Sequence, residues 1–377
     1  MLRRLGKGGD LELISRAYHM VFAHVMGVQG LFFVITGQIS LPHIIFGIVL
    51  TYLSAIGIAA GAHRLWSHRS YKAKLRLRIM LMIMQTLAGQ GSLFYWARDH
   101  RLHHKYSETD ADPHNISRGI FFTHIGWTMV KEHPQVTEKE KTIDFLDLHK
   151  DPVVAFQHKY FRIFDLILYH AMPILIPYYL WLPSLYMCVS VNYLRFVISY
   201  NTSSLGNSVA HTWTRKPYQK DIGPADVTWL SLLIVGEGWH NFHHVFPWDY
   251  RSTDVGLYVC NLATAFIDLM AKIGWAYDLK TVPDHVIRRR AARTGDGSHP
   301  HATLSAEEEG EKEKTQDDDD TNEKDINTNI KTDFNENQMA IDKLDVGDIE
   351  PAPWGWGDKD IPREDAQETV VSHGKSE

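Results

Sequence analysis

The stretch HIIFGIVLTYLSAIGIAAGAHRLWSH, residues 43–68, joins an apolar segment to a pair of histidines. A transmembrane helix needs about 20 predominantly apolar residues. Residues 43–62 meet that need without any Asp, Glu, Lys or Arg, and His63 and His68 follow at once. The sequence therefore predicts a span that carries imidazole groups to the membrane surface.

Three further apolar runs, residues 20–37, 163–182 and 183–200, have similar lengths, and short uncharged links join the four runs in pairs. Basic residues precede the first run and follow the second and fourth, and basic flanks stay on the cytosolic side of a membrane. We predict an all-α integral membrane protein with four transmembrane helices in two hairpins and both termini in the cytosol. A cleaved signal peptide is the alternative for the first run, but no small-residue cleavage site follows it. The apolar segments 79–89 and 227–236 are too short to span and suit interfacial or core helices.

Charge divides the chain into two regions. Residues 1–290 carry 30 Lys and Arg against 21 Asp and Glu, residues 291–377 carry 9 against 24, and the net charge is −6. The stretch EEEGEKEKTQDDDDTNEKD, residues 307–325, is highly charged and poor in apolar residues, which is typical of disorder. We predict a membrane domain over 1–290 and a disordered acidic tail over 291–377, with an acidic interaction tail as the alternative. A WGWG patch at 354–357 could dock elsewhere, although the sequence indicates no place for it.

Eight of the 22 histidines lie in three tight groups on the predicted cytosolic side. HRLWSH contains His63 and His68, HRLHH contains His100, His103 and His104, HNFHH contains His240, His243 and His244, and NSVAH adds Asn207 and His211. Residues three and four apart share a helical face, so each HxxHH motif projects its imidazoles into one sector. His63 and His68 are five apart and converge only if their helix ends or distorts.

These ten side chains could supply two metal ions with four or five ligands each. Neutral imidazole suits Fe, Zn, Cu and Ni, but a structural zinc site uses four ligands, and no cysteine lies in the motifs. A pair of irons, which can activate dioxygen, is the best fit. Nearby carboxylates could orient the ring N–H groups: Asp99, Glu108, Asp110, Asp112 and Glu237.

Four stretches, GAHRLWSHRSYKAK, YWARDHRLHHKYSETDADPHN, RGIFFTHIGWTMVKEHP and GEGWHNFHHVFPWDYR, resemble the motifs of membrane fatty acyl-CoA desaturases. Over residues 15–280 the chain is similar to the stearoyl-CoA desaturase-like family. The resemblance implies two irons in a cytosolic helical cap above a tunnel among the spans, in the endoplasmic reticulum membrane. It also implies the ligands His63, His68, His100, His103, His104, His211, His240, His243 and His244, with Asn207 acting directly or through water.

The same resemblance implies contacts with a fatty acyl-CoA substrate. Trp96 matches a residue that helps to bend the acyl chain, Arg98 and Asp99 match the CoA entrance, and Thr51 and Ala55 match the tunnel floor. The alternatives are interfacial anchoring for Trp96, a surface ion pair for Arg98, and ordinary helix packing for Thr51 and Ala55.

Three stretches depart from the family pattern. GQGS stands where an Asn-containing stretch is usual, Ser203 replaces a tunnel-lining Thr and Ser204 a Trp, and Glu132 follows Lys131 where two basic residues are usual. The metal motifs match while positions near the substrate differ. Our hypothesis is retained chemistry with an altered substrate, bond position or stereochemistry.

The expected function is therefore an acyl-CoA desaturase that uses O2. The sequence contains no nicotinamide, flavin or haem-binding motif, so electrons should come from a separate partner. The resemblance implies cytochrome b5, an acidic carrier that the basic cytosolic face would attract; membrane lipid is expected around the spans, and no nucleic acid. A di-iron lipid hydroxylase or a sphingolipid desaturase could share these motifs. A metal transporter should carry ligands inside its spans, and a non-catalytic lipid-binding protein would lack iron.

Overall fold

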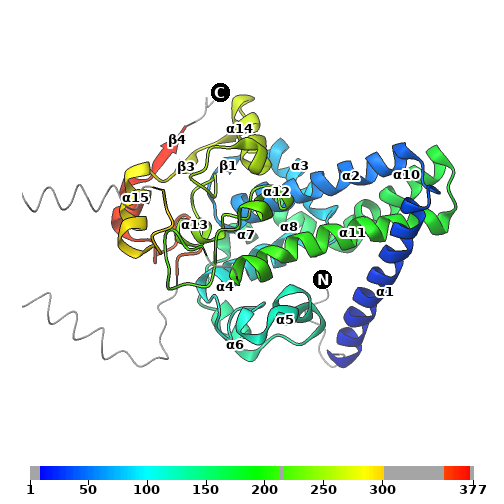
Figure 1. Cartoon of the computed structure of the whole chain (residues 1–377), viewed down its shortest axis with the longest axis horizontal. Coiled ribbons are helices and arrows are strands. Elements are labelled where there is room, and N and C mark those ends of the chain that lie inside the picture. The colour runs from blue at the N-terminus through cyan, green and yellow to red at the C-terminus, as the bar shows by residue number, and fades with distance from the viewer. Residues whose placement is uncertain (1–8, 213–214, 301–351, 374–377) are drawn as a thin grey trace, which may run out of the picture.

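The protein is described by a computed structural model over residues 9–212, 215–300 and 352–373. Long helices form one end of the molecule, and short helices, loops and small strands gather at the other (Figure 1). The long helices are α1 (Gly9–Ile35), α2 (Leu41–Ile56) with its continuation as the π-helix η1 (Gly57–Ser67), α10 (Met172–Trp181) and α11 (Leu185–Ser208).

Among the described residues, three helical segments are long and apolar enough to cross a membrane: Ile14–Ile35, Leu41–Ser67 and Phe161–Trp181. The last of them joins α9 (Phe161–Phe164), the π-helix η4 (Asp165–Ala171) and α10. Large apolar side chains such as Val25 and Ile48 point outward from these segments and are exposed. Surfaces of this kind suit lipid rather than water, so the segments indicate a membrane protein.

The fourth predicted span corresponds to α11, a 24-residue helix that is not among these three segments. It carries the buried polar residues Asn192 and Arg195. The Asn192 side chain donates to the Tyr169 carbonyl at 3.0 Å and Arg195 donates to the Leu87 carbonyl at 2.9 Å. α11 also packs closely along α1. Polar groups that are paired inside a helix bundle in this way can be kept away from lipid.

The other end of the molecule holds the short elements. They are α3 (Leu75–Thr86), α4 (Leu93–Lys105), η2 (Ile116–Arg118), α5 (Ile120–His124), η3 (Gly126–Met129), α6 (Pro134–Glu140), α7 (Leu146–Lys150), α8 (Pro152–Lys159), η5 (Val209–His211), α12 (Thr228–Leu233), α13 (His240–Val245), η6 (Tyr258–Cys260), α14 (Leu262–Lys272) and α15 (Asp284–Thr294). Side chains that accept backbone N–H groups begin several of them: Ser92 caps α4, Asp151 caps α8 and Asn261 caps α14. As predicted, the two short apolar segments form short helices, α3 and α12.

Two pairs of short antiparallel strands close this end. β1 (Lys72–Ala73) pairs with β2 (Ala276–Tyr277), and β3 (Leu279–Thr281) pairs with β4 (Val370–Ser372). The second pair joins residues that lie about ninety positions apart in the chain, so it fastens the C-terminal region onto the body.

The C-terminal region differs from the predicted disordered tail. α15 continues the folded body to Thr294, and residues 352–373 fold against it through β4 and α18 (Arg363–Glu368). Trp354 and Ile361 are buried in apolar clusters. The prediction of disorder is wrong for these residues, because they carry the large apolar side chains that the acidic run lacks. The run itself, 307–325, lies outside the described residues.

Candidate metal centre

The histidine motifs come together at the end of the long helices, in two adjacent groups. Group A consists of His63, His68, His100, His104 and His243, and group B consists of His103, His211, His240 and His244. Within each group the candidate ligand atoms all lie within 4.8 Å of one another. The structure thus brings together all nine histidines singled out in the sequence as ligands.

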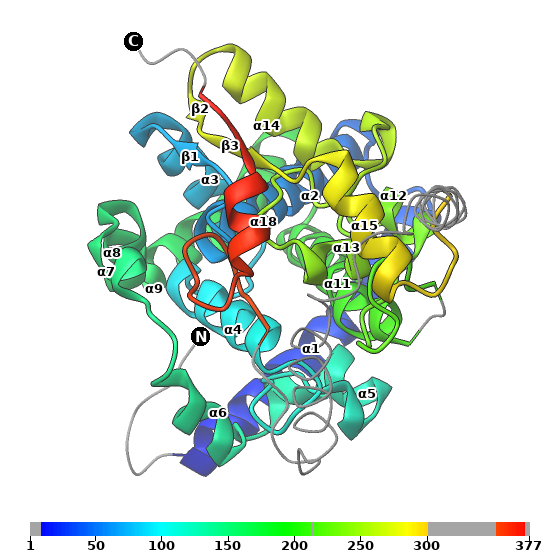
Figure 2. The same cartoon turned by 90° about the vertical axis from the view of Figure 1, so that its left-hand side faces the viewer.

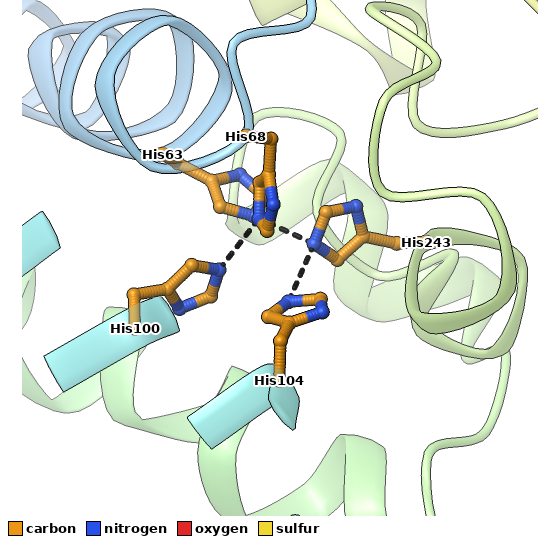
Figure 3. A group of neighbouring side chains, drawn as sticks. All are labelled: His63, His68, His100, His104 and His243. Atoms are coloured by element: carbon orange, nitrogen blue, oxygen red, sulfur yellow. Dashed lines mark hydrogen bonds between the residues drawn. The ribbon is translucent and has the colours of Figure 1, made fainter. Parts of the chain in front are cut away.

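In group A the ring nitrogens point toward one small space (Figure 3). The Nε2 atoms of His63 and His243 lie 2.8 Å apart, those of His68 and His100 lie 2.9 Å apart, and those of His243 and His104 lie 3.0 Å apart. Four of the five side chains are buried, and His100 is half-buried. Three regions supply these side chains: η1 together with the residue that follows it, α4 and α13.

Group B is fully buried and lies next to group A. The Nε2 atom of His240 lies 3.0 Å from that of His211 and 3.1 Å from that of His244. His211 ends η5, directly after α11, so the group connects a long helix with α4 and α13. Asn207 lies one turn earlier on α11 and lines the neighbouring cavities.

The π-helix η1 explains how His63 and His68 reach the same group. In a π-helix each N–H group bonds to the carbonyl five residues earlier, and the His68 N–H donates to the His63 carbonyl at 3.1 Å. Residues five apart are therefore brought onto one side. This confirms the expectation that the helix must distort between the two histidines.

The other ring nitrogen of several histidines faces an acceptor. His63 Nδ1 lies 3.0 Å from Glu237 Oε2, His103 Nδ1 lies 3.0 Å from Asp112 Oδ2, and His211 Nδ1 lies 3.7 Å from Glu108 Oε1. Three of the five predicted orienting carboxylates thus lie beside a ligand candidate. Of the other two, Asp99 bonds with Arg98, and Asp110 lies 3.9 Å from the partly exposed His133.

This arrangement suits a bound cation. A carboxylate next to Nδ1 holds the proton there, which leaves Nε2 of His63 and His103 as acceptors. His63 Nε2 then faces His243 Nε2 at 2.8 Å, and the buried His103 Nε2 makes no hydrogen bond with any described residue. Lone pairs that converge in this way, away from water, need a positive charge between them, and a metal ion supplies it.

Burial keeps most of these imidazoles neutral. Desolvation, followed by repulsion from the neighbouring histidines, lowers the pKa values of His100, His104, His243 and His244 well below 6.5. Neutral imidazole is the form that binds metal, so the fold prepares the ligands for a metal at physiological pH.

An apolar cavity of about 590 Å³ reaches group A from among the long helices. Its lining includes Thr51 and Ala55 of α2, Trp96 of α4, and Ser203 and Asn207 of α11. The histidines that border it are His63 and His100 of group A and His240 of group B. A second cavity, about 180 Å³, shares Trp96, His100, Ser203 and Asn207 with the first and adds Asp99. The two cavities therefore meet beside the histidines.

Trp96 and Ser203 are linked across this meeting point by a residue that the sequence analysis did not select. Gln90 accepts from Trp96 Nε1 at 3.1 Å and donates to Ser203 Oγ at 3.1 Å. Gln90 lies in the GQGS stretch that departs from the family pattern, which could have drawn attention to it.

Arg98, predicted at the CoA entrance, is 2% exposed and is not among the described residues that line either cavity. Its guanidinium donates to Asp99 and to Glu132, at 2.9 Å in each case, and to Glu140 at 3.4 Å. Glu132, one of the departures, is thus part of the network that holds Arg98.

His114 is a second residue that the sequence analysis missed. It is buried, and with His103 and Asp112 it forms a further set of candidate ligand atoms at the edge of group B. Burial and the neighbouring His103 lower its pKa to about 3. His114 follows the DADP turn, ten residues beyond His104. It was missed because the other ligands were selected by their spacing of three to five residues within a motif.

Comparison with known proteins agrees with this geometry. Residues 39–277 match the fatty acid desaturase family, which is more than half of the chain. The chain belongs to this family. The desaturase is 43% identical over 358 residues to an acyl-CoA Delta-9 desaturase of Acheta domesticus, covering 95% of this chain and 85% of the relative.

Two other relatives of the desaturase cover less of it. An acyl-CoA Delta(11) desaturase of Trichoplusia ni is 50% identical over 277 residues, or 74% of this chain and 79% of the relative. A stearoyl-CoA desaturase 5 of Bos taurus is 51% identical over 249 residues, or 65% and 73%. The resemblance seen in the sequence motifs is confirmed, and as a family member this desaturase is an enzyme, an oxidoreductase.

Proposed function

We propose that this desaturase inserts a double bond into a fatty acyl chain that is bound as its CoA thioester. The observation that carries the proposal is an apolar cavity that ends beside two buried histidine groups. The printed names of the relatives support an acyl-CoA substrate.

The reaction removes one hydrogen from each of two adjacent methylene groups. O2 is the oxidant and is reduced to two molecules of water, which takes four protons and four electrons. The two hydrogens of the chain provide two of each, a donor provides the other two electrons, and solvent provides the other two protons. Groups A and B, with Asn207 beside group B, would hold two irons, which would supply the oxidising power that amino-acid side chains lack. Cytochrome b5 is the proposed electron donor.

The residues of the protein hold the chain in place and keep water away. Trp96, Gln90 and Ser203 form a hydrogen-bonded bridge at the junction of the two cavities, where an acyl chain that occupies both cavities would pass. Thr51 and Ala55 lie on α2 and line the larger cavity, so they can limit the length of chain that enters. Position matters because misplacing a reacting carbon by about 1 Å can cost 10²-fold in rate.

We assign Arg98 an indirect part at the entrance. Arg98 is held by three carboxylates, so it orients Asp99, which lines the smaller cavity. With Glu132 in place of a second basic residue, the entrance carries less positive charge than the family pattern implies. This supports the hypothesis of an altered substrate, bond position or stereochemistry.

The membrane arrangement is part of the proposal. The three apolar segments and α11 would form four spans in two hairpins, with both termini and the histidine groups on the cytosolic side of the endoplasmic reticulum. The basic residues that flank the spans support this orientation.

Lipid products from a desaturase-deficient yeast test the proposal. Cells that express the chain should gain unsaturated fatty acids from labelled saturated C16 and C18 chains, and derivatisation locates the new bond. His103→Ala, which removes one group B imidazole, should give none. Iron-loaded protein that makes no unsaturated product, with acyl-CoA and a reducing partner present, would contradict the proposal. An ordinary delta-nine product would contradict only the altered specificity.

A further inference from the structure

We propose that the C-terminal segment 352–373, called the strap, positions His68 in group A through the backbone carbonyl of Trp354. The strap would be a working part of the metal centre, although about 280 residues separate it from His68 in the chain. This inference rests on the proposed metal-binding function of the two groups.

The strap contacts His68 through both the ring and the backbone. The Trp354 carbonyl accepts a hydrogen bond from His68 Nδ1, and the Trp356 N–H donates to the His68 carbonyl at 2.8 Å. Gly355, between them, lies so close that a Cβ there would sit 2.6 Å from the His68 carbonyl oxygen and 2.7 Å from its Cα. Only glycine fits this contact without a shift of the strap or of His68.

The Trp354 side chain fastens this contact to the end of η1. The Arg69 and Arg101 guanidiniums lie 4.3 Å and 4.2 Å from its ring centroid, within the range of cation–π attraction. Arg101 is fully buried, and it also donates to the Trp66 and Ser67 carbonyls at 2.6 Å and 3.2 Å. The buried ring therefore joins α4 and the last turn before His68 in one assembly.

The rest of the strap is held from several sides. Lys105, which follows His104 on α4, pairs with Asp360 at 2.6 Å and with Asp358 at 3.4 Å. Further along, β4 pairs with β3, and Trp248 Nε1 donates to Thr369 Oγ1 at 3.1 Å. Figure 2 shows the strap, in red, crossing the face of the molecule between α4 and α15.

These contacts give His68 a fixed ring orientation. With its Nδ1 proton donated to the Trp354 carbonyl, Nε2 is left as a ligand atom, and it lies 2.9 Å from His100 Nε2. A histidine ligand commonly donates its second ring N–H to a carboxylate or carbonyl, and loss of that partner typically costs 10- to 100-fold in metal affinity. Group B instead has Asp112 and Glu108 beside its rings, so loss of the strap should affect the two groups unequally.

Gly355→Ala in the full chain tests the assignment. The added Cβ should move the strap off His68, so group A should bind iron about 10 to 100 times more weakly and release it faster, while group B keeps its ion. The measurements are iron per chain and the rate of iron transfer to a ferrous chelator. Gly256→Ala is the matched control, since Gly256 is exposed and a Cβ there would meet nothing within 4 Å.

A second pair of variants separates positioning from folding. Trp354→Phe keeps a ring for the two guanidiniums and should retain both irons, whereas Trp354→Ala should lose iron from group A first. Thermal unfolding of the metal-free proteins reports any general loss of fold. Equal iron release from both groups, or wild-type release in Gly355→Ala, would overturn the inference. If the wild-type chain binds no iron at all, the proposed function fails instead.

Discussion

Groups A and B use the same two helices in opposite ways. α4 gives its first and last histidines, His100 and His104, to group A and its middle one, His103, to group B. α13 gives His240 and His244 to group B and the middle one, His243, to group A. Each HxxHH motif therefore divides between the groups, since residues four apart lie nearly in line on a helix and the residue three along is turned aside.

The two groups differ in what completes them. Group A receives His63 and His68 from the end of the apolar helical segment Leu41–Ser67 and has the Trp354 carbonyl and Glu237 beside its rings. Group B receives His211 from the end of α11 and has Asp112 and Glu108 beside its rings. The groups that contact the rings of group A, Glu237 and the Trp354 carbonyl, thus lie far from α4 in the chain. The carboxylates that contact the rings of group B, Glu108 and Asp112, follow α4 closely.

Removing one ligand from each group should have the largest effect. His243→Ala and His244→Ala change adjacent residues of α13, yet each removes an imidazole from a different group. Both should lower desaturation more than ~100-fold, because the proposed metal centre would supply the oxidising step. Each variant should keep the iron of the other group, measured as iron per chain. Loss of both irons from either variant would show that the groups do not bind metal independently.

Much of this centre could be predicted from the sequence. The spacing of HRLHH and HNFHH selected six of the nine histidines, and HRLWSH added two whose convergence required a distorted helix. The apolar run before His63 predicted a span, and Leu41–Ser67 is a helical segment long and apolar enough to be one. Local patterns succeed here because helical spacing and hydrophobic length act within a few turns of one chain segment.

The other features of the fold and of the centre could not be predicted, because they depend on tertiary contacts between distant segments. Trp354 follows a highly acidic stretch, and nothing in the local sequence shows that its ring packs against the guanidinium groups of Arg69 and Arg101. The sequence predicted an apolar run where α11 lies, but not that its buried Asn192 and Arg195 pair with backbone carbonyls of other segments. The division of each HxxHH motif between two groups also depends on how α4 and α13 face each other, and helical spacing alone placed the three rings in one sector.

Removing the orienting carboxylates should give an intermediate effect. Glu237→Gln and Asp112→Asn each replace a carboxylate with an amide of the same shape, and each should weaken iron binding about 10- to 100-fold in its own group. Glu237 also binds the buried Arg64, whose Nε donates to it at 3.0 Å. Glu237→Gln should therefore lower the stability of the metal-free protein too, because it leaves a buried guanidinium without its counter-charge.

Iron titration and thermal unfolding of the metal-free variants check this difference. Asp112→Asn serves as the control for Glu237→Gln, since the described ion pairs of Asp112 involve only histidines. Equal loss of stability in both variants would contradict the special dependence of group A on Glu237 and Arg64.

The smallest effect should come from Glu108, which modifies how the stability of the protein depends on pH. Burial lowers the pKa values of most histidines in both groups. Below pH 6.5 these histidines therefore bind protons in the unfolded chain but not in the folded chain. The metal-free protein should therefore lose stability as pH falls from 7.5 to 5.5, by at most about 1.4 kcal/mol per pH unit for each such histidine.

Glu108 opposes this effect at one histidine of group B, because its carboxylate raises the pKa of His211 against the dominant effect of burial. Glu108→Gln removes this support, so His211 should resist protonation more strongly and the fall in stability below pH 6.5 should become slightly steeper. Melting temperatures of the metal-free wild type and variant at pH 7.5, 6.5 and 5.5 measure the slope. An unchanged or shallower slope in Glu108→Gln would show that Glu108 does not act on His211, and the contrast between the acidic partner of His211 in group B and the carbonyl partner of His68 in group A would then lose its electrostatic part.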